Sequence, residues 1–185
     1  MSTTAIVVGT VLAVVFVAAA IILIIRNRRS QRLRTRFGPE YSRALEETGS
    51  KTKAEARLER LVKRVERFDV RPLSPANRAD FVAAWQKIQA RFVDDPNGAI
   101  VEADKLIQEI MVARGYPVTD FDQRAADISV DHPLIVEHYR SGHDIALQHS
   151  KGRASTEDMR QAMLHYRTLF AELADEPELT RSARA

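Results

Sequence analysis

The chain has 185 residues, of which 45% are hydrophobic and 29% are charged, and its formal net charge at pH 7 is +3. This length allows one globular domain with an appendage, and the composition is not that of a disordered or low-complexity chain. Because the sequence contains no cysteine, disulfides, Fe–S clusters, zinc fingers and cysteine nucleophiles are excluded.

The first predicted element is a transmembrane helix at residues 5–25, preceded by a short extracytoplasmic N-terminus at residues 1–4. No charged residue occurs from Ser2 to Ile25. At about 1.5 Å per residue, residues 5–25 form a helix of roughly 31 Å, which matches a hydrocarbon core of about 30 Å. Within this span, Gly9 and Ala13 form a small-xxx-small pair, which is a candidate packing face for a second helix in the membrane.

A cluster of six arginines follows the span: Arg26, Arg28, Arg29, Arg32, Arg34 and Arg36. Basic residues are retained on the cytoplasmic side, so the cluster predicts a single-pass N-out/C-in topology with the C-terminal domain in the cytoplasm. A cleaved signal peptide is the competing interpretation. The neutral start and the long apolar run, which continues into arginine, favour an uncleaved anchor.

The alkaline pI of about 9.4 arises from this local cluster. After Arg36 the chain carries 22 basic and 25 acidic residues, and residues 69–185 carry 14 basic and 19 acidic residues. A net negative domain repels phosphate, so nucleic acid is not an expected partner.

Residues 26–68 are predicted to be a basic helical connector. Gly38-Pro39 and Gly49-Ser50 interrupt it, leaving a short helix near residues 40–47 and a longer one near 51–68. Apolar residues recur at helical spacing along the longer helix, at Ala54, Leu58, Leu61, Val62, Val65 and Phe68. This helix is expected to lie on anionic lipid headgroups, to pair with a second copy of the chain, or to dock on the domain that follows.

The domain proper is predicted at residues 69–176, with a flexible tail at 177–185. No stretch alternates at the period of a strand. We therefore expect an all-α fold: a compact bundle of about five helices behind the connector and the transmembrane helix. The helices are predicted at 75–93, from 96 to about 114, from about 119 to 128, from about 131 to 149, and from 155 onward.

Helix-terminal residues predict most of these boundaries. The expected N-terminal caps are Ser74, Asp95, Thr119, Asp131 and Ser155, the last in a capping box with Asp158, and Gly115 is the expected left-handed stop. Trp85 and three methionines, Met111, Met159 and Met163, are interpreted as core residues.

No motif predicts catalysis, a cofactor or a metal ion. His132, His138, His143, His149 and His165 fall within 34 residues, but those on one predicted helix lack the spacing of 3 or 4 that would let them share an ion. The aspartates do not match a calcium loop, and no phosphate-binding glycine loop or nucleophile motif is present. We therefore expect a protein that is not an enzyme.

Seven strings together resemble an uncharacterised family of bacterial single-pass membrane proteins with a cytoplasmic helical domain. The resemblance spans nearly all of Arg32 to Leu173 and rests on RFGPEY (36–41), RPLSP (71–75), ARFVDDP (90–96), ARGYP (113–117), QRAADISVDHP (123–133), STEDMRQAM (155–163) and HYRTLF (165–170). It implies a bacterial plasma membrane and supplies no activity.

Two functions remain open from the sequence. The favoured one is a membrane-anchored helical interaction or adaptor protein with an unknown protein partner. The alternative is a lipid-surface or envelope-organising protein whose basic connector binds anionic headgroups, with homo-oligomerisation as a further candidate property.

Overall fold

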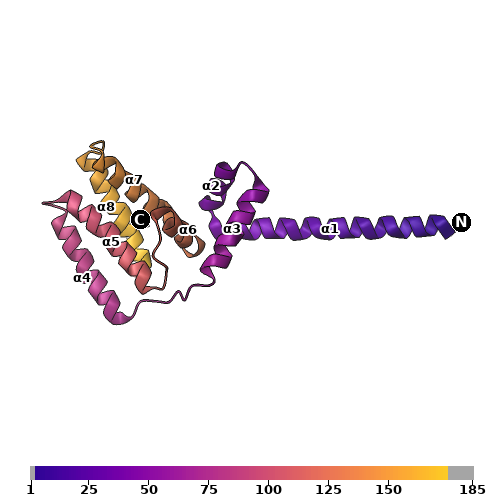
Figure 1. Cartoon of the computed structure of the whole chain (residues 1–185), viewed down its shortest axis with the longest axis horizontal. Coiled ribbons are helices and arrows are strands. Elements are labelled where there is room, and N and C mark those ends of the chain that lie inside the picture. The colour runs from indigo at the N-terminus through magenta and orange to yellow at the C-terminus, as the bar shows by residue number, and fades with distance from the viewer. Residues whose placement is uncertain (1–2, 175–185) are drawn as a thin grey trace. The chain divides into compact units, whose positions relative to one another are not determined.

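The computed structural model describes the backbone of residues 3–174 and the side chains of residues 12–174. The predicted tail at 177–185 lies outside the described residues. Of the predicted packing pair in the membrane, the surroundings of Gly9 are not described, and Ala13 is exposed. Within the described part the chain is helical without strands, which confirms the predicted all-α class (Figure 1). The helices are α1 (Thr3–Phe37), α2 (Pro39–Thr48), α3 (Lys51–Val65), α4 (Pro75–Arg91), α5 (Pro96–Ala113), α6 (Phe121–Asp131), α7 (Val136–Ser150) and α8 (Thr156–Leu173).

The chain divides into two compact units, which we call the proximal unit (residues 1–59) and the distal unit (residues 60–185). The division falls inside α3, before the predicted start of the domain at residue 69.

Helix α1 runs without a break from Thr3 to Phe37, so the apolar stretch and the six arginines belong to one helix. Between Leu12 and Ile25 its large apolar side chains are exposed. Over the part of the chain that the structure describes, no helix combines the length and the apolar character that crossing a membrane requires.

Two glycines with positive φ shape the proximal unit. Gly38, at φ 49°, separates α1 from α2, and Gly49, at φ 61°, ends α2 in the left-handed conformation. The predicted short helix is thereby confirmed, one residue longer at each end. The buried apolar residues of this unit are Leu33, Phe37, Tyr41, Ala44, Ala54 and Leu58.

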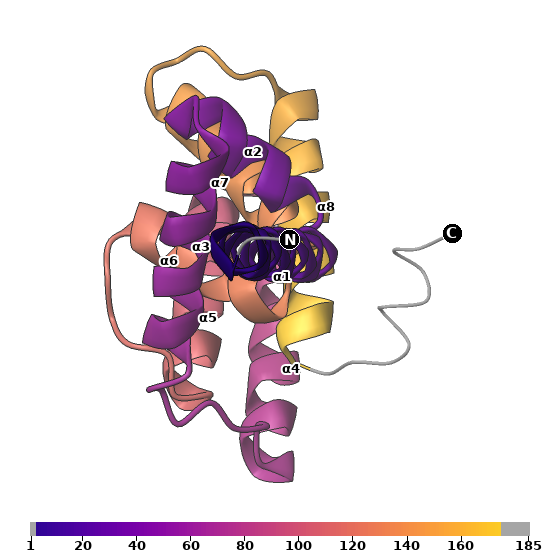
Figure 2. The same ribbon diagram turned by 90° about the vertical axis from the view of Figure 1, so that its right-hand side faces the viewer.

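Up to residue 174, the distal unit contains the end of α3 and five complete helices, α4 to α8, as predicted for the domain. Helix α8 packs against both α5 and α7, α4 packs against α5, and α6 packs against α7 (Figures 1 and 2). The resulting core is continuous and includes residues from all five helices. At its centre the indole of Trp85 stacks on the ring of Phe170, with ring centroids 4.9 Å apart.

Most predicted helix caps are confirmed. The Ser74 hydroxyl accepts a hydrogen bond from Asn77 N at 3.1 Å, and the Asp95 carboxylate accepts one from Gly98 N at 2.8 Å. The capping box of Ser155 and Asp158 is present. Gly115 follows α5 at φ 96°, as its role as a left-handed stop requires.

The predicted starts of α6 and α7 were wrong. Asp120, not Thr119, caps α6 by accepting from Gln123 N at 2.9 Å. Asp131 is the last residue of α6 and accepts a hydrogen bond from the Tyr116 hydroxyl at 2.9 Å. Because Asp131 ends α6, α7 begins only at Val136.

Candidate functional site

The six arginines predicted to set the membrane topology have different surroundings on α1. Arg29 pairs with Glu59 of α3, and the guanidinium of Arg34 lies 5.1 Å from the centroid of the Tyr41 ring. The side chains of Arg26, Arg28, Arg32 and Arg36 are exposed. Contacts within the proximal unit therefore hold Arg29 and Arg34.

Tyr41 of α2 joins the three helices of the proximal unit. Its hydroxyl donates to Glu55 of α3 at 2.9 Å and lies 3.5 Å from the Ser30 hydroxyl of α1. Burial raises the pKa of Glu55, but hydrogen bonds from Ser30 and Tyr41 outweigh burial and leave that pKa below its usual value. The carboxylate thus stays ionised between the helices.

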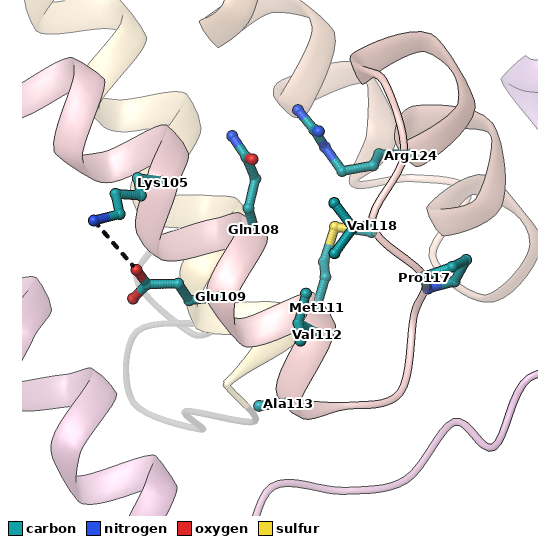
Figure 3. A pocket seen from close by; sticks show the side chains of 9 residues that line it. All are labelled: Lys105, Gln108, Glu109, Met111, Val112, Ala113, Pro117, Val118 and Arg124. Atoms are coloured by element: carbon teal, nitrogen blue, oxygen red, sulfur yellow. Dashed lines mark ion pairs between the residues drawn. The ribbon is translucent and has the colours of Figure 1, made fainter.

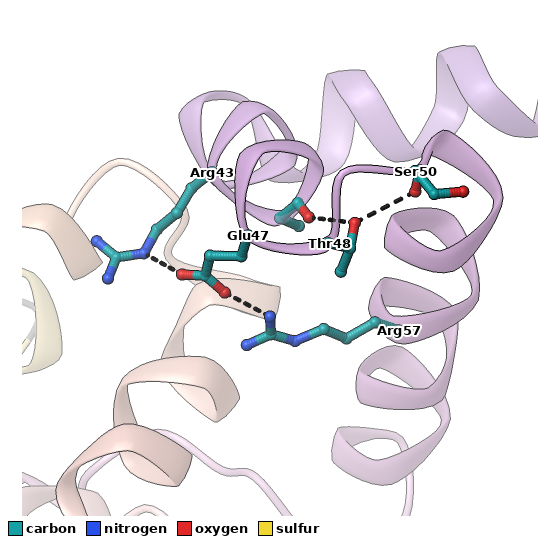
Figure 4. A network of polar contacts seen from close by, with 6 residues as sticks. Arg43, Glu47, Thr48, Ser50 and Arg57 are labelled. Carbon is teal, nitrogen blue, oxygen red and sulfur yellow. Dashed lines mark hydrogen bonds and ion pairs between the residues drawn. The ribbon is translucent and has the colours of Figure 1, made fainter.

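A second polar network lies on the outside of this unit (Figure 4). The Glu47 carboxylate accepts from Arg57 at 2.5 Å and from Arg43 at 2.9 Å. The hydrogen bond from Arg57, ahead of the opposing effect of burial, lowers the pKa of Glu47. The Thr48 hydroxyl donates to the Ala44 carbonyl at 2.7 Å. These contacts tie α2 to α3, so the predicted connector is a folded unit between residues 29 and 59.

The distal unit carries an open groove of about 390 Å³, which we call the Arg124 groove (Figure 3). Helix α5, the segment leading into α6 and the first turn of α6 form it. Its lining residues are Lys105, Gln108, Glu109, Met111, Val112, Ala113, Pro117, Val118 and Arg124. Its volume falls within the range of about 300–1,000 Å³ that is usual for ligand sites. Val112 and Val118 are 50% and 81% exposed, respectively.

A layer of polar side chains lies behind this groove. Arg124 donates to the Tyr139 hydroxyl at 3.1 Å and to the Thr119 carbonyl at 2.5 Å. Asp104 accepts from the Tyr166 hydroxyl at 3.3 Å and from Gln108 at 2.6 Å. Burial, followed by the effect of Asp104, raises the pKa of Tyr139 to about 12. The phenol is therefore neutral where it contacts Arg124 and Asp104.

The structure separates most of the histidines. His143 stacks on Phe121 with ring centroids 3.6 Å apart, and His132 Nδ1 lies 3.3 Å from a Glu172 carboxylate oxygen. His149 lines a second cavity of about 330 Å³ beside Ile100, Val101 and Met159.

His138 of α7 and His165 of α8 form the exception. Their Nδ1 atoms lie 2.9 Å apart, and burial, followed by the charge of His138, lowers the pKa of His165. These two histidines are 27 residues apart on different helices, so the spacing of histidines within one helix does not reveal the pair. Among residues 12–174, no three His, Cys, Asp or Glu side chains are placed to hold a metal ion together.

Asp127 of α6 is the most buried carboxylate of the distal unit, with only 1% of its surface exposed. Its Oδ1 accepts from Arg64 Nε at 3.0 Å and from Gln123 at 2.8 Å. Because Arg64 belongs to the last turn of α3, this ion pair joins the end of the predicted connector to the helical bundle. Docking, one of the three alternatives for this helix, therefore applies to its C-terminal end.

Comparison of the chain with protein-family models, curated proteins and solved structures finds no match. The candidate function therefore rests on the residues and geometry described above.

Proposed function

We propose that this chain is a membrane-anchored, non-enzymatic helical interaction protein of adaptor type. Residues 5–25 cross the bacterial plasma membrane, and the two helical units lie on the cytoplasmic side. The uncharged apolar stretch, the exposed apolar side chains from Leu12 to Ile25 and the arginines after them support this arrangement.

The Arg124 groove is the observation that carries the interaction role. Exposed Val112 and Val118 on the rim of a concave apolar surface are the arrangement expected of a binding site, since monomeric proteins seldom expose contiguous apolar patches without a use. The groove lining combines apolar side chains with the hydrogen-bonding groups of one arginine and one glutamine, and this combination favours the binding of a partner. The distal unit therefore recruits its partner through this groove.

Site-directed photocrosslinking in native membranes tests the proposal. A photoreactive residue in place of Val118 should give a discrete adduct. The same residue in place of Val93 should not, although Val93 is equally exposed at 82% and lies outside the groove lining. Equal adduct patterns at the two positions would remove the groove as the interaction site.

The second candidate function is lipid-surface binding by the basic helix end. It is supported by the exposed side chains of Arg26, Arg28 and Arg32, which directly follow the apolar stretch. For a helix along the bilayer normal, Arg32 lies about 10 Å beyond Ile25, whereas Arg36 lies about 16 Å beyond it. The Debye length at physiological salt is about 8 Å, so the arginines nearest the span are the ones suited to anionic headgroups.

A further inference from the structure

Arg124 is a cation fixed at the groove by uncharged acceptors. Its Nε donates to the Tyr139 hydroxyl, and its Nη1 donates to the Thr119 backbone carbonyl. Tyr139 is fully buried, and its phenol lies between Arg124 and the Asp104 carboxylate. The guanidinium is therefore held in place without a direct carboxylate partner in its described hydrogen bonds.

The other two charged residues of the groove lining, Lys105 and Glu109, neutralise each other at a distance from Arg124. The Glu109 carboxylate lies 3.7 Å from Lys105 Nζ, one helical turn along α5, and both side chains extend toward solvent. Figure 3 shows this pair apart from the Arg124 side chain. Arg124 thus supplies the net positive charge of the lining residues.

Apolar side chains form the adjoining wall. Met111 and Val112 of α5 and Pro117 and Val118 of the following segment line the groove and are labelled in Figure 3. An occupant therefore meets a hydrophobic surface and, at one end, a guanidinium with donor capacity left. A carboxylate at that end would gain charge-assisted hydrogen bonds, which are the strong ones in proteins.

We propose that the Arg124 groove binds a single-chain amphiphilic carboxylate, with its alkyl chain along Met111 and Val118 and its head group on Arg124. This inference rests on the proposed function, because it names the occupant of the same groove. Because Tyr139 and the Thr119 carbonyl hold the guanidinium before binding, little side-chain entropy is lost when the head group docks.

The test uses the full chain in nanodiscs of zwitterionic lipid. A diazirine analogue of decanoic acid is photocrosslinked, the labelled peptides are mapped, and unlabelled decanoate and decanol compete. The label should fall on residues 105–124, and decanoate should compete at least about tenfold more strongly than decanol, since a hydrogen bond to a charged group contributes roughly 1.5–3 kcal/mol.

Two variants keep the result interpretable. Arg124→Gln should remove the preference for decanoate over decanol, whereas Arg124→Lys should keep most of it. Lys87→Gln, which removes an exposed charge outside the groove lining, should leave the preference unchanged. Cooperative urea unfolding, followed by the single tryptophan, shows whether each variant is folded.

Equal competition by decanol, an unchanged preference in folded Arg124→Gln, or labelling spread outside the groove would overturn the inference. A protein adduct at position 118 together with no labelling by the decanoic acid analogue would overturn it too, while leaving the proposed interaction role standing. Absence of both would remove both proposals.

Discussion

At the scale of single residues, the His138–His165 pair is expected to make the stability of the distal unit depend on pH. Two Nδ1 atoms 2.9 Å apart need one donor and one acceptor, so the contact is compatible with at most one protonated ring. Burial of His165 and the neighbouring His138 lower the pKa of His165, and Glu137 opposes them more weakly. Acid thus acts against the contact between α7 and α8.

The first prediction is that the free energy of unfolding falls as the pH drops below about 6.5, the usual pKa of histidine. Below that value the unfolded chain takes up a proton at His165 that the folded chain resists, so stability is present above it and is lost on acidification. Urea unfolding at pH 7 and pH 5.5, followed by Trp85 fluorescence, measures the change.

A matched pair of variants separates this contact from other titrations. His165→Gln should reduce the loss of stability between the two pH values, whereas His149→Gln should keep it. If the two variants retained the same dependence on pH, the histidine pair would not be its source.

A buried carboxylate gives the second prediction at the residue scale. Arg64→Ala should lower the free energy of unfolding by about 1–2 kcal/mol, because Asp127 loses a charged donor while the half-exposed guanidinium is partly screened by solvent. Arg60→Ala, an exposed neighbour on the same helix, should change it by less than about 0.5 kcal/mol.

The double variant Arg64→Ala with Asp127→Asn provides the decisive comparison, measured by the same urea titration. Removing the negative charge as well should recover part of the lost stability, since the penalty comes from a buried carboxylate without its partner. If the double variant lost more free energy of unfolding than the two single variants lose in sum, this explanation would be wrong.

At the scale of elements, Gly115 controls how the segment before α4 meets the end of α5. Arg71 N donates to the Arg114 carbonyl at 2.9 Å, and a Cβ on Gly115 would lie 2.1 Å from the Asp69 carbonyl oxygen. Such an approach is possible only for glycine. The linker before α4 therefore follows the C-terminus of α5 closely.

Gly115→Ala and Gly152→Ala form the third prediction as a matched pair. Both glycines have positive φ, but a Cβ on Gly152 meets no atom within 4 Å. Gly152→Ala should cost about 1–2 kcal/mol for the left-handed backbone alone, and Gly115→Ala should cost about 1–3 kcal/mol more for the collision. Equal losses in thermal or urea unfolding would mean that the linker moves freely.

The whole molecule is predicted to have an N-out/C-in topology, which is the fourth prediction. A fluorescent reporter that matures in the cytoplasm should be active when fused after Ala185, and a reporter active only outside the cytoplasm should be silent there. The reverse pattern would place both helical units on the extracytoplasmic side and would refute the orientation taken from the arginine cluster.

The fifth prediction concerns the charge of the whole proximal unit. A fragment covering residues 26–174 should float with anionic vesicles at low salt, release as salt rises and ignore neutral vesicles. Replacing Arg28 and Arg32 by Gln should weaken binding more than replacing Arg34 and Arg36, because the Arg34 guanidinium already lies 5.1 Å from the centroid of the Tyr41 ring. Equal effects would argue against a special role for the arginines nearest the apolar stretch.

The sequence by itself determined the all-α class, the five helices of the distal unit and most of their ends. Three helices are capped by side chains that accept hydrogen bonds from backbone N–H groups three residues ahead: Ser74, Asp95 and Ser155. Gly115 ends α5 through its own positive φ. Such contacts are local, so the residues that make them stand together in the sequence. The prediction that Asp131 caps a helix was wrong because its carboxylate accepts a hydrogen bond from Tyr116, which lies 15 residues away.

Only the tertiary structure decided which distant residues meet. It joined His138 to His165, Arg64 to Asp127 and Arg124 to Tyr139, and it formed the Arg124 groove from α5 and the segment after it. No periodicity marks these pairs, because each depends on how two packed helices are rotated about their axes. Helix rotation is set by the shape of the common core, which a local pattern of residues does not contain.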